Sequence, residues 1–158
     1  MTAISIQRAT VNDAHNIAVM VGELLNEIMT TIGINFFNFS LEETKERLVD
    51  FIGREKYFVF VALNERLDPV GFVALFEGHA LYAEGAFGTI PELFVRPAFR
   101  SQNVGLRLVS QAKVFGISRG WKRLEVTTPP LPQFDKTMLF YEREGFAITG
   151  GRKLKVLL

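Results

Sequence analysis

The residues with the clearest chemical potential form a short turn at positions 100 to 105, Arg-Ser-Gln-Asn-Val-Gly. A strand-like run precedes the turn, and apolar residues at helical spacing follow it. The first N–H groups of a helix lack partners in the helix and can bind a phosphate group. Position 103, where glycine is expected, is Asn103, and asparagine is the residue that best tolerates a left-handed backbone after glycine. The turn is therefore a candidate anion site, with a plain helix cap as the alternative.

Charge is distributed unevenly along the chain. Residues 1–92 carry 6 basic and 13 acidic side chains, whereas residues 93–158 carry 12 basic and 4 acidic ones. Between Glu92 and Glu125 there are seven bases and no acid: Arg96, Arg100, Arg107, Lys113, Arg119, Lys122 and Arg123. A solvated helix face and a surface for a polyanion both fit this pattern.

Length and composition set the limits of the fold. A chain of 158 residues with 48% hydrophobic side chains predicts a single domain, residues 1–158, with a core of its own. The absence of cysteine excludes disulfides, thiolate metal sites and a cysteine nucleophile. His15 and His79 lie far apart without carboxylates spaced around them, so no metal site is expected. The chain begins without a signal peptide pattern and has no long apolar run, which predicts a cytoplasmic protein with no membrane partner.

The elements that must position the turn follow from periodicity and capping signals. Capping boxes at Thr10 and Ser40 predict helices over 11–29 and from 41 to about 53. Further helices are predicted after the turn and from Asp135. The predicted strands are 5–9, 57–63, 70–77, 89–95 and 122–128, with a glycine-rich loop at 78–88 and a closing hairpin of 146–149 and 152–158. Because a helix connects strands 89–95 and 122–128, these two are expected to be parallel, giving an α/β domain with a mixed sheet.

This order of elements resembles that of the GCN5-related N-acetyltransferase (GNAT) family over essentially the whole chain. The resemblance rests on Glu-Leu-Phe-Val-Arg-Pro-Ala-Phe-Arg-Ser-Gln-Asn-Val-Gly at 92–105 and Leu-Phe-Tyr-Glu-Arg-Glu-Gly-Phe at 139–146. Members of the family have a Val-x-Pro motif and then [Arg/Gln]-x-x-Gly-x-[Gly/Ala], from which Asn103 departs. The resemblance implies a mostly antiparallel sheet with a central parallel pair of strands and about four helices. It also implies acetyl-CoA (coenzyme A) as the acyl donor.

The resemblance further implies which residues bind the acyl donor. The turn would bind the pyrophosphate through its amides, and the pantetheine arm would pair with the preceding strand like an added strand. The implied cofactor-binding residues are Phe94, Val95, Arg100, Ser101, Gln102, Asn103, Val104 and Gly105. Phe134 occupies a position where the family often has asparagine, so one amide contact to the cofactor is lost or moved.

Two residues are candidates for proton transfer. Tyr141 matches the tyrosine that many family members use to protonate the departing thiolate, with a packed aromatic side chain as the alternative. Strand alternation places Ile90, Glu92 and Phe94 on one face, where an isolated carboxylate would have a raised pKa and could deprotonate an amine. An exposed or salt-bridged carboxylate is the alternative for Glu92, and Glu84 is a second candidate base.

The acceptor site is implied by the same resemblance. It would be lined by the connection between the first two helices, with Phe36, and by the 78–88 loop, with Tyr82 and Glu84; core packing is the alternative role of the phenylalanines. The expected function is transfer of an acetyl group from acetyl-CoA to a primary amine of a small molecule or peptide, by direct transfer in a ternary complex. A CoA-binding sensor or assembly module without catalysis is the alternative. Nucleic acid is not expected as a partner, and a homodimer stays open.

Overall fold

The computed structural model describes residues 3–35 and 37–158. One five-stranded sheet has the order β1-β2-β3-β4-β5. Its strands are β1 (Ser5–Arg8), β2 (Phe58–Leu63), β3 (Pro69–Ala80), β4 (Gly85–Val95) and β5 (Leu124–Val126). The α-helices are α1 (Ala14–Ile32), α2 (Leu41–Gly53), α3 (Val104–Ser118) and α4 (Asp135–Arg143), and short 3-10 turns lie at Val11–Asp13 and Pro97–Phe99. Of the helices that the structure describes, none is both long and apolar enough to cross a membrane.

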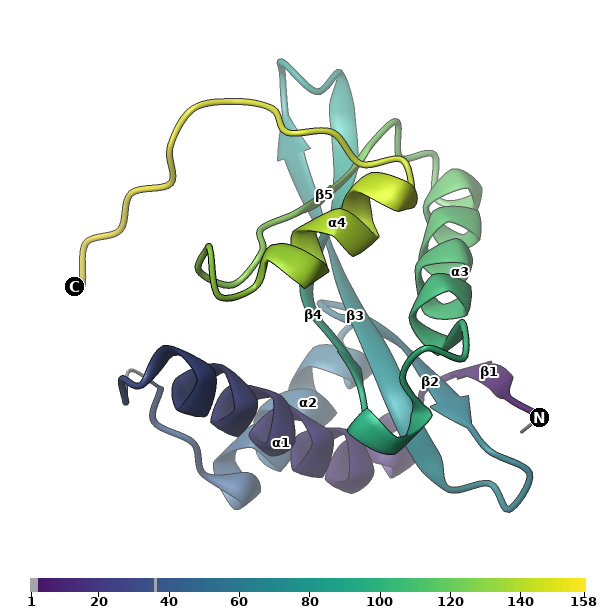
Figure 1. Cartoon of the computed structure of the whole chain (residues 1–158). Coiled ribbons are helices and arrows are strands. Elements are labelled where there is room, and N and C mark those ends of the chain that lie inside the picture. Colours follow the sequence, from purple (N-terminus) through teal and green to yellow (C-terminus); the bar gives the residue numbers. More distant parts are fainter. Residues whose placement is uncertain (1–2, 36) are drawn as a thin grey trace.

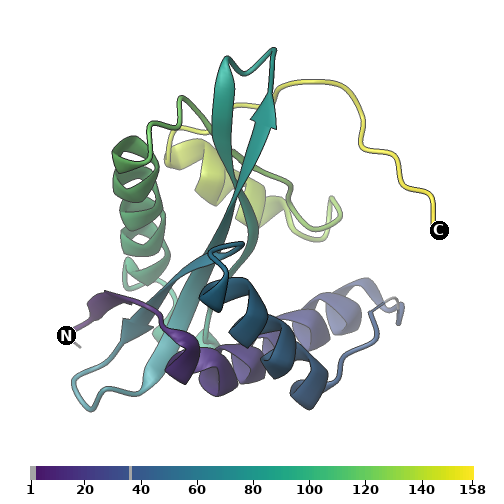
Figure 2. The same cartoon turned by 180° about the vertical axis from the view of Figure 1, so that it is seen from behind.

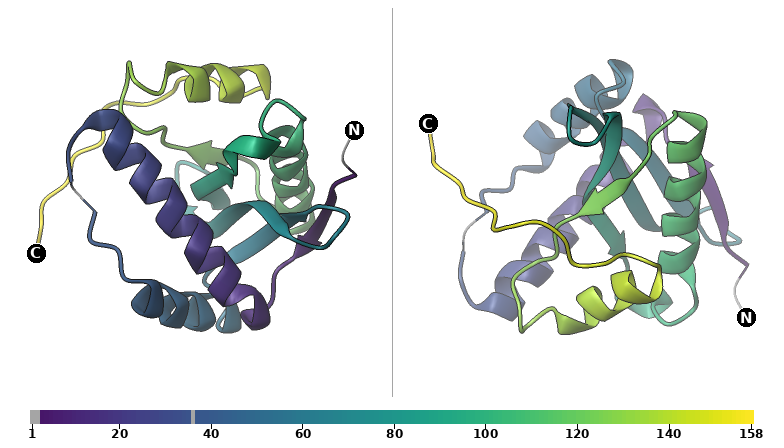
Figure 3. Two further views of the ribbon diagram at one scale, coloured as in Figure 1. Left: turned by 60° about the horizontal axis from the view of Figure 1, so that its bottom comes forward. Right: turned by 90° about the horizontal axis from the view of Figure 1, so that it is seen from above.

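The helices cover the two faces of the sheet in pairs (Figures 1 and 2). Helices α1 and α2 pack on one face, around a core that includes Val59, Phe72 and Phe94. Helices α3 and α4 lie on the other face, where Leu108 and Tyr141 belong to a second core. The arrangement is clearest when the molecule is turned about the horizontal axis (Figure 3). Strands β4 and β5 are parallel and all other pairs are antiparallel, which confirms the predicted mixed sheet.

The predicted helix starts are confirmed by their capping contacts. The Thr10 N–H donates to the Asp13 carboxylate at 2.8 Å, and the Ser40 hydroxyl accepts from the Glu43 N–H at 3.3 Å. These bonds satisfy amides that a helix start otherwise leaves open. The first helix begins with a 3-10 turn and ends at Ile32, three residues beyond the predicted end.

Two predicted segments are wrong. The glycine-rich loop at 78–88 is mostly strand, because β3 and β4 extend into a long hairpin with a turn only at residues 81–84. The closing hairpin is absent from the structure, and residues 147–158 form no strand. Two strands are marginal without a third strand or a helix to cover them. Residues 146–149 lie beside β5, and the rest of the tail extends outward with Leu154 and Val156 exposed (Figure 1).

A β-bulge in β4 changes which side chains share a face. Ala74 of β3 pairs with Glu92, but Phe76 pairs with Thr89, so three steps along β4 oppose two along β3. Because one extra residue reverses the alternation, Ile90 joins the core under α3 and α4, whereas Phe94 joins the core under α1 and α2. The prediction that Ile90, Glu92 and Phe94 share one face is therefore wrong for Ile90. Pro91, which has no N–H to donate, lies at this bulge.

The unevenly distributed charges pair across the fold. Acids of the first half of the chain bind bases of the second half: Glu23 with Arg96, Glu27 with Arg100, Glu77 with Arg119 and Glu84 with Lys122. The nitrogen–oxygen distances in these pairs run from 2.6 to 3.3 Å. Four of the seven bases of the basic run are therefore paired with acids from the first half of the chain.

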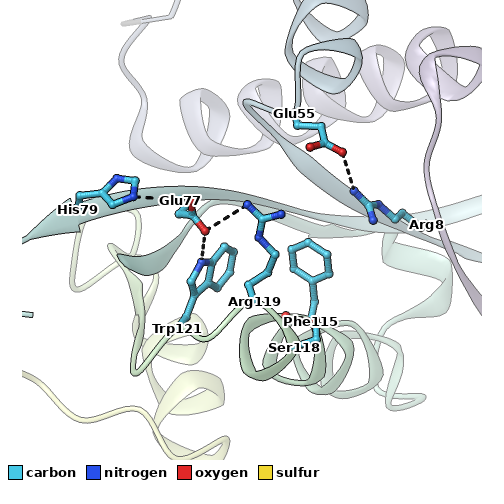
Figure 4. Close-up of polar contacts among 8 residues, drawn as sticks. All are labelled: Arg8, Glu55, Glu77, His79, Phe115, Ser118, Arg119 and Trp121. Atoms are coloured by element: carbon cyan, nitrogen blue, oxygen red, sulfur yellow. Dashed lines mark hydrogen bonds and ion pairs between the residues drawn. The ribbon is translucent and has the colours of Figure 1, made fainter. Parts of the chain in front are cut away.

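Glu77 is the centre of one such network (Figure 4). Its carboxylate accepts the Trp121 indole N–H at 2.6 Å and an Arg119 N–H at 3.3 Å, and His79 lies 3.8 Å away. The hydrogen bond from Trp121, helped by the charge of Arg119, holds the pKa of Glu77 below its usual value. The network links β3 to the residues that directly follow α3.

We expect Glu77→Gln to lower the stability at pH 7 by about 1 kcal/mol, because charge-assisted bonds to Trp121 and Arg119 become weaker neutral ones. A carboxylate whose pKa is lowered by folding stabilises the protein above its unfolded pKa, and this contribution is lost as the pH falls through the folded pKa. The difference in melting temperature between wild type and variant should thus be largest at neutral pH and vanish in acid. Glu46→Gln, at an exposed position on α2, is the matched control. An equal difference at pH 3 and pH 7 would contradict the assignment.

Candidate active site

The turn before α3 presents a row of free amides. Ser101 and Asn103 have φ values of 61° and 64°, and α3 begins at Val104. The first amide after the turn with a backbone acceptor is that of Arg107, which donates to the Asn103 carbonyl at 3.0 Å. Within the described residues, the N–H groups of residues 101–106 donate no hydrogen bond. Successive free amides at a helix start bind anions, and the helix dipole adds to the attraction.

The left-handed conformation of Asn103 confirms the positive φ predicted from the sequence. Its side chain makes no capping hydrogen bond, so the alternative of a simple cap is not supported. Asparagine therefore serves here as a substitute for glycine in the backbone conformation. Gly105 lies next to the Phe140 ring, which an added Cβ would approach only to 3.4 Å, so packing alone does not require glycine there.

We expect Asn103→Gly to keep the affinity for coenzyme A and Asn103→Val to weaken it about 5- to 30-fold. Valine resists the left-handed region that Asn103 adopts, at a cost of roughly 1–2 kcal/mol or more. Isothermal titration of each variant with coenzyme A measures the change. Circular dichroism checks that α3 stays folded. Wild-type affinity in Asn103→Val would show that the turn does not need this conformation to bind the cofactor.

The end of β4 has an open edge. β5 pairs with β4 only at residues 88–90. Among the residues that the structure describes, no strand pairs with residues 91–95 on that side. The Arg96 N–H donates to the Val70 carbonyl of β3 at 2.8 Å. Backbone groups alternate in direction along an antiparallel strand, so those of Phe94 also face β3, while those of Leu93 and Val95 face the open edge.

The direction of the backbone groups along β4 corrects one predicted contact, that of Phe94 with the pantetheine arm. The Phe94 carbonyl lies over β3, where a Cβ on Gly71 would come within 2.7 Å of it. Phe94 is thus badly placed for the backbone pairing predicted with the pantetheine arm. Leu93, two residues before Val95, is the residue that alternation brings to the edge. Val95 stays a predicted contact.

The Arg100 side chain points toward α1. Its Nε donates to the Val95 carbonyl at 2.8 Å, and its Nη2 lies 2.6 Å from Glu27 of α1. The guanidinium also lies 5.6 Å from the centre of the Phe94 ring. Arg100 therefore links the turn to α1 and uses the carbonyl oxygen that an added strand would need.

Glu92 is half-buried on the face covered by α1 and α2. The Tyr57 hydroxyl donates to its two carboxylate oxygens, at 3.2 and 3.3 Å. Burial raises the pKa of Glu92 to about 7, against a smaller lowering effect of the Tyr57 hydrogen bond. The exposed and salt-bridged alternatives for this carboxylate are not what the structure shows. A carboxylate with this pKa can accept a proton near neutral pH.

Tyr141 is buried on the opposite face. Its ring makes edge contacts with Phe140 and Phe146, each at 5.3 Å between ring centres. Burial raises the pKa of Tyr141, so its hydroxyl stays protonated at neutral pH. The residue also lines a groove of about 650 Å³ between β5 and α4, whose lining includes Thr89, Val126 and Met138.

Glu92 and Tyr141 therefore lie on opposite faces of the sheet. β4 continues to Val95 whereas its pairing with β5 ends at Ile90, so the sheet has an opening beside residues 91–95. Tyr141 and Thr89, one residue before the end of that pairing, line the same groove. The catalytic roles of Glu92 and Tyr141 stay predictions.

Tyr82 and Glu84, by contrast, do not join this site. They lie in the turn of the β3–β4 hairpin, where Glu84 pairs with Lys122 at 2.9 Å and Tyr82 is 73% exposed. Glu92 is eight residues along the strand from Glu84, which corresponds to roughly 26 Å. The structure thus gives no support to Glu84 as a base, or to either residue as an acceptor contact.

The predicted acceptor residue Phe36 lies outside the described residues. Its neighbour Phe39 packs against Gly22 of α1, where an added Cβ would come within 2.7 Å of the ring. Glycine at this position therefore provides the space for the ring.

Tyr57 was missed by the sequence prediction. Alternation places it on the same face of its strand as Val59 and Val61, which was visible in the sequence. Its contact with Glu92 crosses β3 and depends on the register of three strands, which local patterns do not reveal.

Comparisons with known proteins give a consistent result. Residues 55–148 match a protein family described as "Acetyltransferase (GNAT) domain". A solved aminoglycoside acetyltransferase from an uncultured soil metagenomic sample is 20% identical, with a TM-score of 0.77 over 98% of this chain and 96% of the other. A GCN5-related N-acetyltransferase from Ralstonia eutropha JMP134 is 15% identical, with a TM-score of 0.78 over 98% and 99%. The ribosomal-protein-alanine N-acetyltransferase of Brucella melitensis biovar Abortus 2308 is also 15% identical, with a TM-score of 0.73 over 98% and 100%. A search among curated proteins found no match.

Proposed function

Because this chain belongs to the GNAT acetyltransferase family, we propose that it transfers an acetyl group from acetyl-CoA to a primary amine of a small molecule or peptide. The observation that carries the proposal is the row of free amides at residues 101–106, placed directly after the open edge of β4. This combination suits a ligand with a phosphate group at one end and an amide-containing arm at the other.

Coenzyme A has both of these parts, and each fits particular backbone groups. The amides of the turn would hold the pyrophosphate, and the backbone groups of Leu93 and Val95 would pair with the amides of the pantetheine arm. Bound acetyl-CoA supplies a thioester, an acyl group already activated for attack by an amine. The Nε of Arg100 already donates to the Val95 carbonyl, so an amide of the arm would share that oxygen, which can accept two hydrogen bonds, or displace the guanidinium.

The proton transfers are assigned to the half-buried Glu92 and the buried Tyr141. Glu92 accepts a proton from the ammonium form of the acceptor, which leaves the amine lone pair free to attack the thioester carbon. As the carbon–sulfur bond breaks, the Tyr141 hydroxyl donates a proton to the departing sulfur, and the second proton that the nitrogen loses as the amide forms returns to the Tyr141 oxygen through solvent. A thiol has a pKa near ~8.5, so protonation of the thiolate eases its departure. No covalent enzyme intermediate is required, which agrees with direct transfer in a ternary complex.

The surroundings of Glu92 favour an amine that carries an apolar portion. Phe51 and Phe76 flank Tyr57, at ring-centre distances of 5.0 and 6.4 Å. Aromatic rings beside a carboxylate attract a cation and also pack against hydrocarbon. The names of the similar structures include an aminoglycoside and a ribosomal-protein alanine as acceptors, so aminoglycosides and peptides both belong in the test panel.

The experiment is an acyl-transfer assay with acetyl-CoA and a panel of aryl-alkylamines, aminoglycosides and peptides. Free thiol release is followed with a thiol-reactive dye, and since the chain has no cysteine it contributes no background. Turnover with acetylated product in the mass spectrum supports the proposal. Tight coenzyme A binding without turnover on any amine would favour the sensor or assembly module, and no coenzyme A binding would contradict both.

A further inference from the structure

Tyr57 is held in place by two aromatic neighbours. It directly precedes β2, and its ring lies 5.0 Å from Phe51 of α2 and stacks with Phe76 of β3 at 6.4 Å and 12° between planes. Contacts on two sides leave the ring little freedom to turn. The position of the hydroxyl is therefore set by packing, independently of its hydrogen bond.

The hydroxyl reaches across β3 to Glu92. Val59 of β2 pairs with Ala74 of β3, and Ala74 pairs with Glu92 of β4, so these three residues form one row across the sheet. Ala74 carries only a methyl group, and this small side chain leaves room above β3. Through this space the Tyr57 hydroxyl donates to both carboxylate oxygens of Glu92, at 3.2 and 3.3 Å.

We propose that Tyr57 is a positioning residue for the reaction, which fixes the Glu92 carboxylate in one orientation and favours its ionised form. The inference rests on the proposed function, in which Glu92 takes the proton of the acceptor amine. In that step the proton moves from the ammonium nitrogen to a Glu92 oxygen, and Tyr57 keeps its own proton throughout.

Tyr57 is the right kind of group for this role. Burial, followed by the charge of Glu92, raises the pKa of Tyr57, so the phenol remains a donor over the working pH range. A donor to a carboxylate stabilises the charged form, and the hydrogen bond accordingly lowers the pKa of Glu92 against the larger effect of burial.

The other charged groups around this face are engaged elsewhere. Directly after β4, Arg96 binds Glu23 of α1 through two nitrogens at 3.0 and 2.8 Å. Glu27 of α1 binds Arg100, and on α2 the carboxylate of Asp50 binds Arg54 and Lys56. Among the described residues, the Tyr57 hydroxyl is thus the group that donates a hydrogen bond to Glu92.

The first test is the pH profile of kcat/KM in Tyr57→Phe, with the best amine found in the assay. Without the donor, the Glu92 carboxylate ionises less readily, so the acidic limb of the profile should move to higher pH by about one unit. At pH 6.5 the rate should fall about 10-fold and recover as the pH rises above 8. Unchanged coenzyme A affinity shows that the variant is folded.

A double-mutant cycle separates positioning from a general structural role. If Tyr57 acts through Glu92, Tyr57→Phe should have no further effect on kcat/KM in the Glu92→Gln background. Placing 3-fluorotyrosine at position 57 keeps the shape and strengthens the donor, so the limb should move to lower pH. Additive losses in the cycle, or a limb that moves in neither variant, would overturn the inference.

A titration of Glu92 itself tests the inference without catalysis. In protein with ¹³C-labelled glutamate carboxyls, the Glu92 signal is assigned by its loss in Glu92→Gln. We expect its midpoint near pH 7 in wild type and higher in Tyr57→Phe. Equal midpoints would refute the role of Tyr57 even if no amine is ever turned over, whereas shifted midpoints without turnover would place the fault in the proposed function.

Discussion

Glu92→Gln is expected to reduce kcat/KM about 10²- to 10³-fold at pH 7, with little change in coenzyme A affinity. Glutamine has the size of glutamate and its amide oxygen can still accept the Tyr57 hydroxyl, so the fold is retained. It cannot accept a proton, and the acceptor amine, with a pKa near ~10, then remains mostly in its unreactive ammonium form. Steady-state thiol release measures the loss.

The pH dependence of the same variant gives a second check. In the wild type the base must be ionised, so the rate should rise with pH around the Glu92 pKa of about 7. In Glu92→Gln this limb should disappear, and the residual rate should follow the free amine up to higher pH. Glu84→Gln, at the tip of the β3–β4 hairpin, should match the wild type. A loss in Glu84→Gln with normal rates in Glu92→Gln would contradict the assignment of the base.

Tyr141→Phe is expected to reduce kcat about 10²-fold while KM for the amine and coenzyme A affinity stay within a few-fold of wild type. Phenylalanine keeps the edge contacts with Phe140 and Phe146, so the ring remains packed and only the proton donor is lost. The loss should appear in kcat because the donor acts when the carbon–sulfur bond breaks.

The leaving group provides the sharpest control for Tyr141. An acetyl thioester of a more acidic thiol needs less help from a proton donor. The difference in kcat between wild type and Tyr141→Phe should therefore be smaller with this thioester than with acetyl-CoA. Tyr82→Phe, the exposed tyrosine of the hairpin, should be indistinguishable from wild type. A full rate in Tyr141→Phe would leave Tyr141 with a packing role only.

The proposed acid, Tyr141, and the proposed base, Glu92, differ in how far each could be identified from the sequence. Tyr141 belongs to a local pattern in a short helix, and the likeness of that pattern to a family motif is enough to single it out. Glu92 can also be identified from the sequence, and it shares a face with Phe94 as strand alternation predicts. The β-bulge at Pro91 moves Ile90 to the other face, and the hydrogen bond from Tyr57, which comes from two strands away, could not be predicted.

The contacts of the acyl donor show the same division. The free amides of the turn and the positive φ of Asn103 follow from local chain geometry, and the sequence predicted both. Which backbone groups of β4 remain open depends on the pairing with β3, and the structure replaces Phe94 by Leu93. The Arg100 side chain, predicted to bind the cofactor, is instead drawn to Glu27, which lies 73 residues away in the chain.

The amino-acid sequence by itself determined the order of the four helices and five strands, the parallel pair and the left-handed turn before α3. These depend on capping, periodicity and backbone preference, which act over a few neighbouring residues. The tertiary structure alone decided the partners of the charged side chains, the face of Ile90, the contact of Glu92 with Tyr57 and the failure of residues 146–158 to form a hairpin. Those outcomes depend on strand register and on burial by distant segments, and a one-residue shift at a bulge is enough to move a side chain to the other face.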